Sequence, residues 1–291
     1  MKEYALFLGC TVPVRALNYE ISTRKVADAL GIKLIDLEDF SCCGFTIRSI
    51  NYNASLIMAA RSLAIAEENK LDICTLCSAC TSFLTEVNKE IKEDNKLKKR
   101  VNEDLGSIGR TYNGTVEVKH FARILYDELG TDKIREKVIN PLSGLKIAAH
   151  YGCHYIKPSE IYNFENPEAP FTLDELIEAT GAISVDYENK NLCCGGGILG
   201  IDEDTALKMS KVKLESIKDN ADAMVLVCPF CDIMYDINQK RIEMRFEENY
   251  NIPVLYYPQL LGLALGFNPR ELGLEMNRVR TTKLLEKITE R

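Results

Sequence analysis

The sequence predicts an α/β protein made of two pseudo-symmetric halves, each a small, mostly parallel sheet flanked by helices. Short apolar runs typical of strands alternate with segments of helical periodicity along the whole chain. Ten of the 11 cysteines form one spacing pattern written twice, with 151 residues between Cys43 and Cys194 and again between Cys77 and Cys228. In both copies the cysteines follow predicted strands, where open α/β sheets place their ligand sites. The pattern therefore predicts two domains with one thiol site each.

The first domain, residues 1–140, alternates predicted strands and helices. The run YALFLG is a buried strand that ends at Cys10, and Gly31 stops the helix that follows it. We expect strands at 4–9, 33–37, 71–74 and 116–120, helices at 15–30, 53–69 and 123–138, and a further helix from the Cys-x-x-Cys segment to about residue 104. The balanced charges of residues 86–104 predict a solvated helix with ion-paired faces.

The second domain, residues 141–291, repeats this order. We expect strands at 145–150, 183–187, 223–227 and 254–257, helices at 173–179, 206–218 and 232–247, and a C-terminal helix that begins at 260–266. Pro141 and Gly144 interrupt the pattern and place the boundary near residues 140–144. The second copy has eight extra residues within 155–171, a loop that either overhangs a site or is a surface excursion.

Composition and charge narrow the class of protein. A chain of 291 residues with 46% hydrophobic and 27% charged residues is typical of a globular protein, and no apolar run reaches the ~18–20 residues that span a bilayer. The N-terminus lacks the apolar stretch of a signal peptide. We therefore expect a cytoplasmic protein, in which clustered cysteines serve metal or redox chemistry more often than disulfides. The net charge of −7 argues against nucleic-acid binding.

Each domain supplies five cysteines, one more than an ordinary metal site needs. The first set is Cys10, Cys42, Cys43, Cys77 and Cys80, and the second is Cys153, Cys193, Cys194, Cys228 and Cys231. Structural zinc and a cubane [4Fe–4S] cluster each take four ligands. Two interpretations stay open: one cysteine per domain is redox-active beside a four-ligand cluster, or the cluster is not a simple cubane. Cysteines buried only as small apolar side chains would not form a matched repeat.

The adjacent cysteines and the glycines behind them favour an extended cluster. The Cβ vectors of neighbouring residues diverge, so such a pair reaches two neighbouring irons more easily than one metal. Gly44 and the run 195–197 allow backbone N–H groups to approach sulfur closely. The eleventh cysteine, Cys74, aligns with Val225 and is interpreted as a core residue of a strand. A ligand pair of Cys74 and Cys77 is the alternative.

These motifs resemble the cysteine-rich CCG-domain family, named after the Cys-Cys-Gly segments found here at residues 42–44 and 193–195. Two such domains over nearly the whole chain, without a ferredoxin-type cysteine run, are similar to the B subunits of heterodisulfide reductases from methanogenic archaea. The resemblance implies that the ten cysteines hold two noncubane [4Fe–4S] clusters, one on each set of five.

For function, the resemblance implies a catalytic subunit that reduces CoM-S-S-CoB, the heterodisulfide of coenzyme M and coenzyme B, to the two thiols in methanogenesis. We hypothesise that each cluster takes one substrate sulfur. The implied partners are a flavin-containing A subunit that bifurcates electrons, a ferredoxin-like C subunit, and a hydrogenase or formate dehydrogenase module. This chain has no flavin or ferredoxin motif of its own, so those groups would come from the partners.

Three further residues are candidates for this reaction. His154 directly follows the first cysteine of the second set and is the candidate proton donor, with a hydrogen bond to cluster sulfur as its alternative role. His120 and His150 belong to strands and are interpreted as structural. The implied substrate carries sulfonate, phosphate and carboxylate groups, and we expect Arg48 and Lys157 to bind them. Solvated surface charge is the alternative for both cations.

Two other functions stay open. An iron–sulfur subunit of a lactate, glycolate or glycerol-phosphate oxidising complex would relay electrons without binding a disulfide. A zinc-stabilised or pure electron-transfer module would not be an enzyme. Iron and acid-labile sulfide analysis separates zinc from clusters, and turnover of the heterodisulfide separates the two redox functions.

Overall fold

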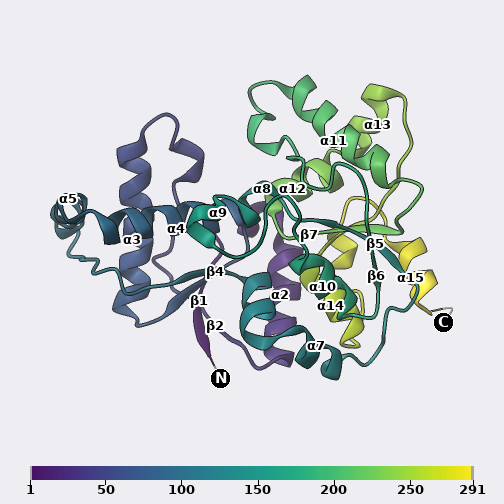
Figure 1. Ribbon diagram of the computed structural model, residues 1–291, viewed down its shortest axis with the longest axis horizontal. Helices are drawn as coiled ribbons and strands as arrows, with labels where there is room; N and C mark the ends of the chain where they lie inside the picture. The colour runs from purple at the N-terminus through teal and green to yellow at the C-terminus, as the bar shows by residue number, and fades with distance from the viewer. Residues whose placement is uncertain (1, 290–291) are drawn as a thin grey trace.

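The computed structural model describes residues 2–289, which fold into two similar half-molecules packed against each other (Figure 1). Within this range the strands form two four-stranded sheets of order β2-β1-β3-β4 and β6-β5-β7-β8. The strands are β1 (Glu3–Phe7), β2 (Lys33–Ile35), β3 (Asp72–Thr75), β4 (Val118–His120), β5 (Lys146–His150), β6 (Ile183–Val185), β7 (Ala223–Leu226) and β8 (Val254–Tyr256). All neighbouring strands are parallel, which confirms the predicted fold class.

Helices flank both sheets. In the first half they are α1 (Val12–Arg15), α2 (Leu17–Ala29), α3 (Tyr52–Glu68), α4 (Ser78–Glu93), α5 (Asn95–Gly106), α6 (Phe121–Arg123) and α7 (Thr131–Lys137). In the second they are α8 (Cys153–Ile156), α9 (Ser159–Tyr162), α10 (Thr172–Glu178), α11 (Glu203–Ile217), α12 (Pro229–Asp232), α13 (Gln239–Phe246), α14 (Tyr257–Ala264) and α15 (Thr282–Thr289). Short 3₁₀ turns are η1 (Phe45–Ile47), η3 (Gly196–Ile198) and η5 (Leu274–Met276), and π-helical turns are η2 (Ile124–Leu129) and η4 (Ile233–Ile237). Within residues 2–289, no helix combines the length and apolar character needed to cross a membrane.

Several predicted helices are divided in the structure. The helix expected to run to residue 104 breaks at Asp94, because its carboxylate accepts hydrogen bonds from the N–H groups of Lys96 and Leu97 and starts α5. The segment 123–138 is divided into the end of α6, the π-helical turn η2 and α7. The helix predicted to begin at 260–266 is instead α14, which ends at Ala264, and the C-terminal helix α15 is separate from it.

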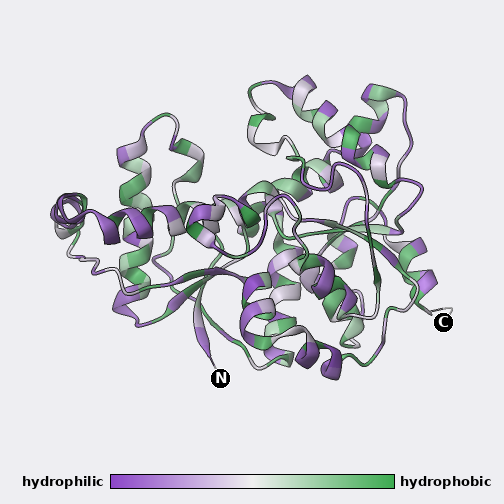
Figure 2. Ribbon diagram, in the orientation of Figure 1, coloured by the Kyte–Doolittle hydropathy of each residue, from purple (hydrophilic) through white to green (hydrophobic). Residues whose placement is uncertain are grey.

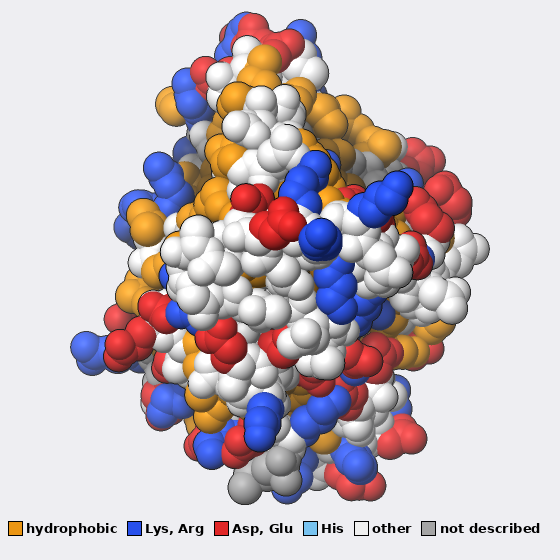
Figure 3. Space-filling model, turned by 90° about the vertical axis from the view of Figure 1, so that its left-hand side faces the viewer, with side chains coloured by type: hydrophobic (Ala, Val, Ile, Leu, Met, Phe, Trp, Pro, Cys, Tyr) orange, Lys and Arg blue, Asp and Glu red, His pale blue; other side chains and the backbone are white. Residues whose placement is uncertain are grey.

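The end of the molecule formed by α4 and α5 is strongly charged. Figure 2 shows α5 as hydrophilic, and Figure 3 shows acidic and basic side chains interspersed over this end. The ion pairs Lys89–Glu93 (2.8 Å) and Lys99–Glu103 (3.9 Å) join residues one helical turn apart. The prediction of a solvated, ion-paired surface is confirmed, although it lies on two helices.

The two halves are joined through buried side chains. Helix α2 of the first half packs on α14 of the second. The ring of Tyr19 in α2 stacks on Tyr256 at the end of β8, with 4.0 Å between the ring centroids. Beside them, the buried amide of Asn18 donates a hydrogen bond of 3.0 Å to the Oδ1 of Asn277. This packing holds the carboxyl ends of the central strands of both sheets near one another.

Candidate metal centre

The five predicted cysteines of the first half come together beyond the carboxyl ends of β1 and β3. Cys10 follows β1, the adjacent pair precedes η1, and the last two stand at the start of α4. All five line one small pocket, which also includes Phe230 of the second half. Hydrogen bonds from Cys42 and Cys80 hold the pKa of the Cys43 thiol well below its usual range. The structure therefore brings the first predicted set together.

The second set converges in the same way beyond β5 and β7. Cys153 opens α8, and its Sγ lies 4.0 Å from the Sγ of Cys193. Hydrogen bonds from Cys153 and Cys194 lower the pKa of the Cys193 thiol to about 2. The hydrogen bond to Cys193 raises the pKa of Cys194 to about 12, and Cys194 is also hydrogen-bonded with Cys231 at the start of α12.

The two sets meet at the boundary between the halves. Cys77 and Cys228 are hydrogen-bonded to each other, which raises the pKa of the Cys77 thiol. The carbonyl of Val227, just before Cys228, accepts hydrogen bonds from three side chains of the first half. They are His120 Nε2 at 2.8 Å, Tyr19 OH at 3.4 Å and Ser78 Oγ at 3.4 Å. First-half side chains therefore position the loop that carries a cysteine of the second set.

His120 has the structural role that the sequence predicts. Its ring Nδ1 accepts a hydrogen bond from the N–H of Ala122, while Nε2 faces the Val227 carbonyl, so the neutral ring satisfies both partners. Complete burial lowers the pKa of His120 to about 4.

Each adjacent cysteine pair is followed by a glycine in a left-handed conformation. Gly44 has φ of +93° and Gly195 has φ of +82°. A Cβ at Gly44 would lie 2.7 Å from the carbonyl oxygen of Ser55, and one at Gly195 would lie 2.8 Å from that of Ala206. The N–H groups of both glycines donate to the sulfur of the first cysteine of their pair, at 3.4 Å. Glycine is therefore needed here for both backbone conformation and space.

The surroundings of the thiols fit a bound group that accepts hydrogen bonds. The hydroxyl of Tyr235 is buried and has no hydrogen-bond partner among the described residues. Burial raises the pKa of Tyr235, and the charges of the nearby Cys194 and Cys231 raise it further. Buried hydroxyls rarely lack a partner. The sulfide of an iron–sulfur cluster would be an acceptor, and thiolates are its usual ligands. Within residues 2–289, no group of three or more His, Cys, Asp or Glu side chains is arranged around a single point as ligands of one metal ion.

Cys74 is separate from this arrangement. It lies fully buried in β3, between Leu6 of β1 and Lys119 of β4, and does not line the first thiol pocket. Burial raises the pKa of its thiol. The structure supports its interpretation as a core residue.

Two predicted site residues, His154 and Arg48, meet on the ring of Phe45. The His154 ring lies edge-on to this ring with 4.8 Å between centroids, and the Arg48 guanidinium lies 4.3 Å from the ring centroid. Glu86 pairs with Arg48 at 3.6 Å. Burial lowers the pKa of His154, and the Arg48 charge lowers it further, whereas the thiolate of Cys228 raises it. The structure thus places an imidazole and a guanidinium together at the boundary between the halves.

The third predicted residue, Lys157, lies with a different partner. Its ammonium is 3.7 Å from the carboxylate of Glu168, and 55% of its side chain is exposed. Both residues belong to the inserted segment 155–171. This segment is no mere surface excursion, because its helix α9 packs on α4 and the OH of Tyr162 donates to the carbonyl of His154 at 3.2 Å.

Two residues near the second set were missed by sequence reasoning. Tyr235 follows Cys231 by one helical turn, and Lys213 lies in α11 with its side chain fully buried. A comparison of the two copies of the repeat could have found them, because polar Tyr235 and charged Lys213 stand where the first half, 151 positions earlier, has Leu84 and Ser62.

Comparison with known proteins agrees with the cysteine pattern. The family model of a cysteine-rich domain, CCG, matches residues 4–85 and 147–236. This chain belongs to the CCG cysteine-rich domain family. It is 42% identical, over all of this chain and 98% of the other, to the B subunit of "Ferredoxin:CoB-CoM heterodisulfide reductase" of Methanosarcina mazei. The family predicted from the cysteine spacing is confirmed.

The chain is also similar to a protein named as a subunit of a different enzyme. The chain is 35% identical, over 97% of its length and 99% of the other, to "8-methylmenaquinol:fumarate reductase membrane anchor subunit" of Wolinella succinogenes. Among solved structures, a hypothetical protein from Helicobacter pylori is similar with a TM-score of 0.78 at 16% identity, over 96% of this chain and 52% of that one. That similarity supports the fold alone.

Proposed function

We propose that this chain is the catalytic iron–sulfur subunit of a heterodisulfide reductase and reduces CoM-S-S-CoB to its two thiols. The S–S bond breaks, and two electrons and two protons are taken up. The observation that carries the proposal is the contact of two five-thiol sites through Cys77 and Cys228, in a chain similar over its full length to a B subunit of that enzyme.

The ten cysteines would hold two noncubane [4Fe–4S] clusters, one on each set. When bound, these clusters supply electrons one at a time and irons with affinity for sulfur. Because the two sets meet at the boundary between the halves, a disulfide placed there would have one cluster beside each sulfur. The glycine N–H groups that point at Cys42 and Cys193 would stabilise negative charge on sulfur.

The side chains at the boundary would orient the substrate and supply a proton. His154 lies near Cys228 and Cys193 of the second set, against Phe45 of the first half, and is the candidate donor to a leaving thiolate. Phe45 and Phe230 line the pocket of the first set and would limit the access of water to it. Arg48 would bind an anionic end of the substrate in place of Glu86, and Lys157 would bind the other end in place of Glu168.

Electrons would reach this chain from other proteins of a complex. A flavin-containing A subunit and a ferredoxin-like C subunit are the expected partners, with a hydrogenase or formate dehydrogenase module as the electron source. The name of the Methanosarcina mazei relative, which is one component of a ferredoxin-dependent enzyme, supports a multi-subunit complex.

A second function, electron relay without disulfide chemistry, is favoured by the similarity to the Wolinella succinogenes protein. Turnover separates the two. The reconstituted chain is mixed with a reduced low-potential dye as electron donor. When CoM-S-S-CoB is added, we expect the dye to be oxidised and two thiols to be released per disulfide. A chain that holds its clusters and passes electrons to an artificial acceptor, but never to the heterodisulfide, would be a relay.

A further inference from the structure

The second thiol site contains a buried cation. Lys213 lies in α11 with 0% of the residue exposed. Its ammonium contacts Nδ1 of His150 at 2.9 Å, the carbonyl oxygen of Lys190 at 2.7 Å and that of Leu192 at 2.8 Å. Leu192 directly precedes the adjacent cysteines of the second set.

The contacts of Lys213 fit a charged ammonium. An ammonium has three N–H donors, and the two carbonyls and the unprotonated His150 nitrogen are three acceptors. Burial lowers the pKa of Lys213 to about 8, while the charges of Cys231, Cys194 and Cys193 raise it. The side chain is therefore protonated at neutral pH. A buried ammonium is costly unless negative charge lies nearby, and a cluster held by the thiolates of the second site would supply that charge.

Among residues 2–289, no buried lysine takes the corresponding place at the first thiol site. In α3 the corresponding position is Ser62, which is also fully buried and donates to the carbonyl of Met58 at 3.3 Å. By strand register, Phe7 of β1 stands where His150 stands in β5. The lysine and its histidine partner thus belong to the second half alone, although the backbone and the cysteines are repeated.

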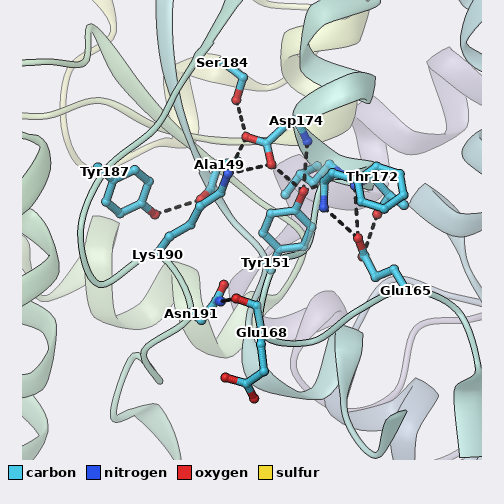
Figure 4. A network of polar contacts seen from close by, with 12 residues as sticks. Ala149, Tyr151, Glu165, Glu168, Thr172, Asp174, Ser184, Tyr187, Lys190 and Asn191 are labelled. Carbon is cyan, nitrogen blue, oxygen red and sulfur yellow. Dashed lines mark hydrogen bonds and ion pairs between the residues drawn. The ribbon is translucent and has the colours of Figure 1, made fainter.

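The loop that precedes the adjacent cysteines does not need a buried lysine to hold it in place. In the first half the corresponding loop is held from the surface, where Arg61 donates to the carbonyl of Asp39 at 2.7 Å. In the second half the same loop already has other side-chain anchors besides Lys213 (Figure 4). Lys190 binds the carboxylate of Asp174 at 2.6 and 2.7 Å, and the amide of Asn191 donates to the carbonyl of Glu168 at 2.7 Å.

We propose that Lys213 is a fixed positive charge that makes the cluster of the second site easier to reduce than the cluster of the first. Reduction adds one negative charge to a cluster, and a nearby cation in a low-dielectric interior stabilises that charge. The first electron that enters the chain would therefore rest at the second site. This inference depends on the cluster content of the proposed function, but not on its substrate.

Neutral variants test the charge separately from the hydrogen bonds. Lys213→Gln keeps two N–H donors and loses the charge, Lys213→Met loses both, and Lys213→Arg keeps both. Each variant is loaded with clusters in a Cys77→Ser background that lacks the first cluster, and its potential is measured by a redox titration followed by electron paramagnetic resonance. Lys213→Gln and Lys213→Met are expected to weaken one-electron reduction about tenfold, equal to about 59 mV, and Lys213→Arg to leave it unchanged.

The matched control is Arg61→Gln in a Cys228→Ser background, which removes the surface anchor of the first site without touching a buried charge. We expect it to leave the first-site potential unchanged. An unchanged potential in Lys213→Gln would overturn the proposal. So would loss of the second cluster from both neutral variants with retention in Lys213→Arg, since this would assign Lys213 to cluster assembly.

The test distinguishes failure of this inference from failure of the proposed function. If the wild-type chain holds two clusters but never reduces CoM-S-S-CoB, the proposed function fails and the potentials still decide the role of Lys213. If the wild-type chain binds no iron or sulfide, both proposals fail together.

Discussion

At the scale of single residues, the candidate proton donor and a candidate anion-binding cation lie together at the boundary between the halves. His154 belongs to the second half and Phe45 to the first, and their rings touch. Arg48 covers the same aromatic ring and is held there by Glu86. A substrate that lies between the thiol sets would therefore be contacted by side chains of both halves.

Substitution of His154 tests its role as a proton donor. His154→Gln keeps the size and polarity of the side chain but cannot deliver a proton. We expect the dye-linked turnover number for CoM-S-S-CoB to fall about 10²-fold, with KM and cluster content nearly unchanged. Full turnover in His154→Gln at neutral pH would leave His154 only a structural or hydrogen-bonding role.

Substitution of the two cations tests anion binding. Arg48→Gln is expected to raise KM for the heterodisulfide about tenfold, because a charge-assisted contact is worth about 1.5–3 kcal/mol. Lys157→Gln should raise KM less, since the Lys157 side chain is half exposed and solvent screens its charge. Steady-state kinetics measures both. If neither variant changes KM, these side chains are solvated surface charges.

The residue scale also shows what the sequence could and could not predict. The ten cysteines were predictable because their spacing repeats, and the structure collects each set of five. The meeting of His154 with Arg48 was not predictable, since it depends on how α8 packs on the first half. The partners of Lys213 were equally hidden, because they are backbone carbonyls and a histidine from another strand.

At the scale of elements, the turns that follow the adjacent cysteines are the most constrained part of the fold. Gly44 and Gly195 combine a left-handed backbone with a neighbouring carbonyl less than 3 Å from any added Cβ. By contrast, Gly197 has no left-handed φ and open space around its Cα. One Cys-Cys-Gly-Gly-Gly segment thus contains both a required glycine and a replaceable one.

Alanine substitutions in this segment test the requirement. Gly195→Ala is expected to lower the free energy of unfolding by about 1–3 kcal/mol or more, through backbone strain and the clash with Ala206. Gly197→Ala should stay within about 0.5 kcal/mol of the wild type. Chemical denaturation measures both. Equal stability of the two variants would contradict the described geometry of the turn.

Element boundaries follow physical features that sequence periodicity does not contain. The strands were predictable as apolar runs, but several are shorter than expected because only three residues of each edge strand pair with a neighbour, as in β2 and β6. Helical segments were predictable, whereas the capping carboxylate of Asp94 and the π-helical turn after α6 interrupted them. Local side-chain bonds outweighed periodicity in these places.

At the scale of the whole molecule, the halves behave as one packed unit in the structure. Buried amides connect them, because Asn277 accepts hydrogen bonds from Asn18 and Gln259 and donates to the carbonyl of Val254. The division into residues 1–140 and 141–291 stays a prediction. The sequence repeat predicted two similar halves, but their packing depends on buried side chains such as these, which no spacing pattern reveals.

The coupling of the halves is testable by unfolding. Asn277→Ala is expected to lower the free energy of unfolding by about 1–3 kcal/mol, since it leaves buried polar groups of both halves without partners. The neighbouring, half-exposed Met276 is the control, and Met276→Ala should have little effect. We expect a single thermal transition in each case. Two separate transitions in the wild-type chain would show that the halves fold independently.

The most direct test of the account is the iron and acid-labile sulfide content of the chain and of three cysteine variants. About eight irons per chain are expected for the wild type, from two four-iron clusters. About four are expected for Cys77→Ser and for Cys228→Ser, and about eight for Cys74→Ser. Zinc in place of iron, or loss of iron from Cys74→Ser with retention in Cys77→Ser, would contradict the assignment of one five-cysteine cluster site to each half.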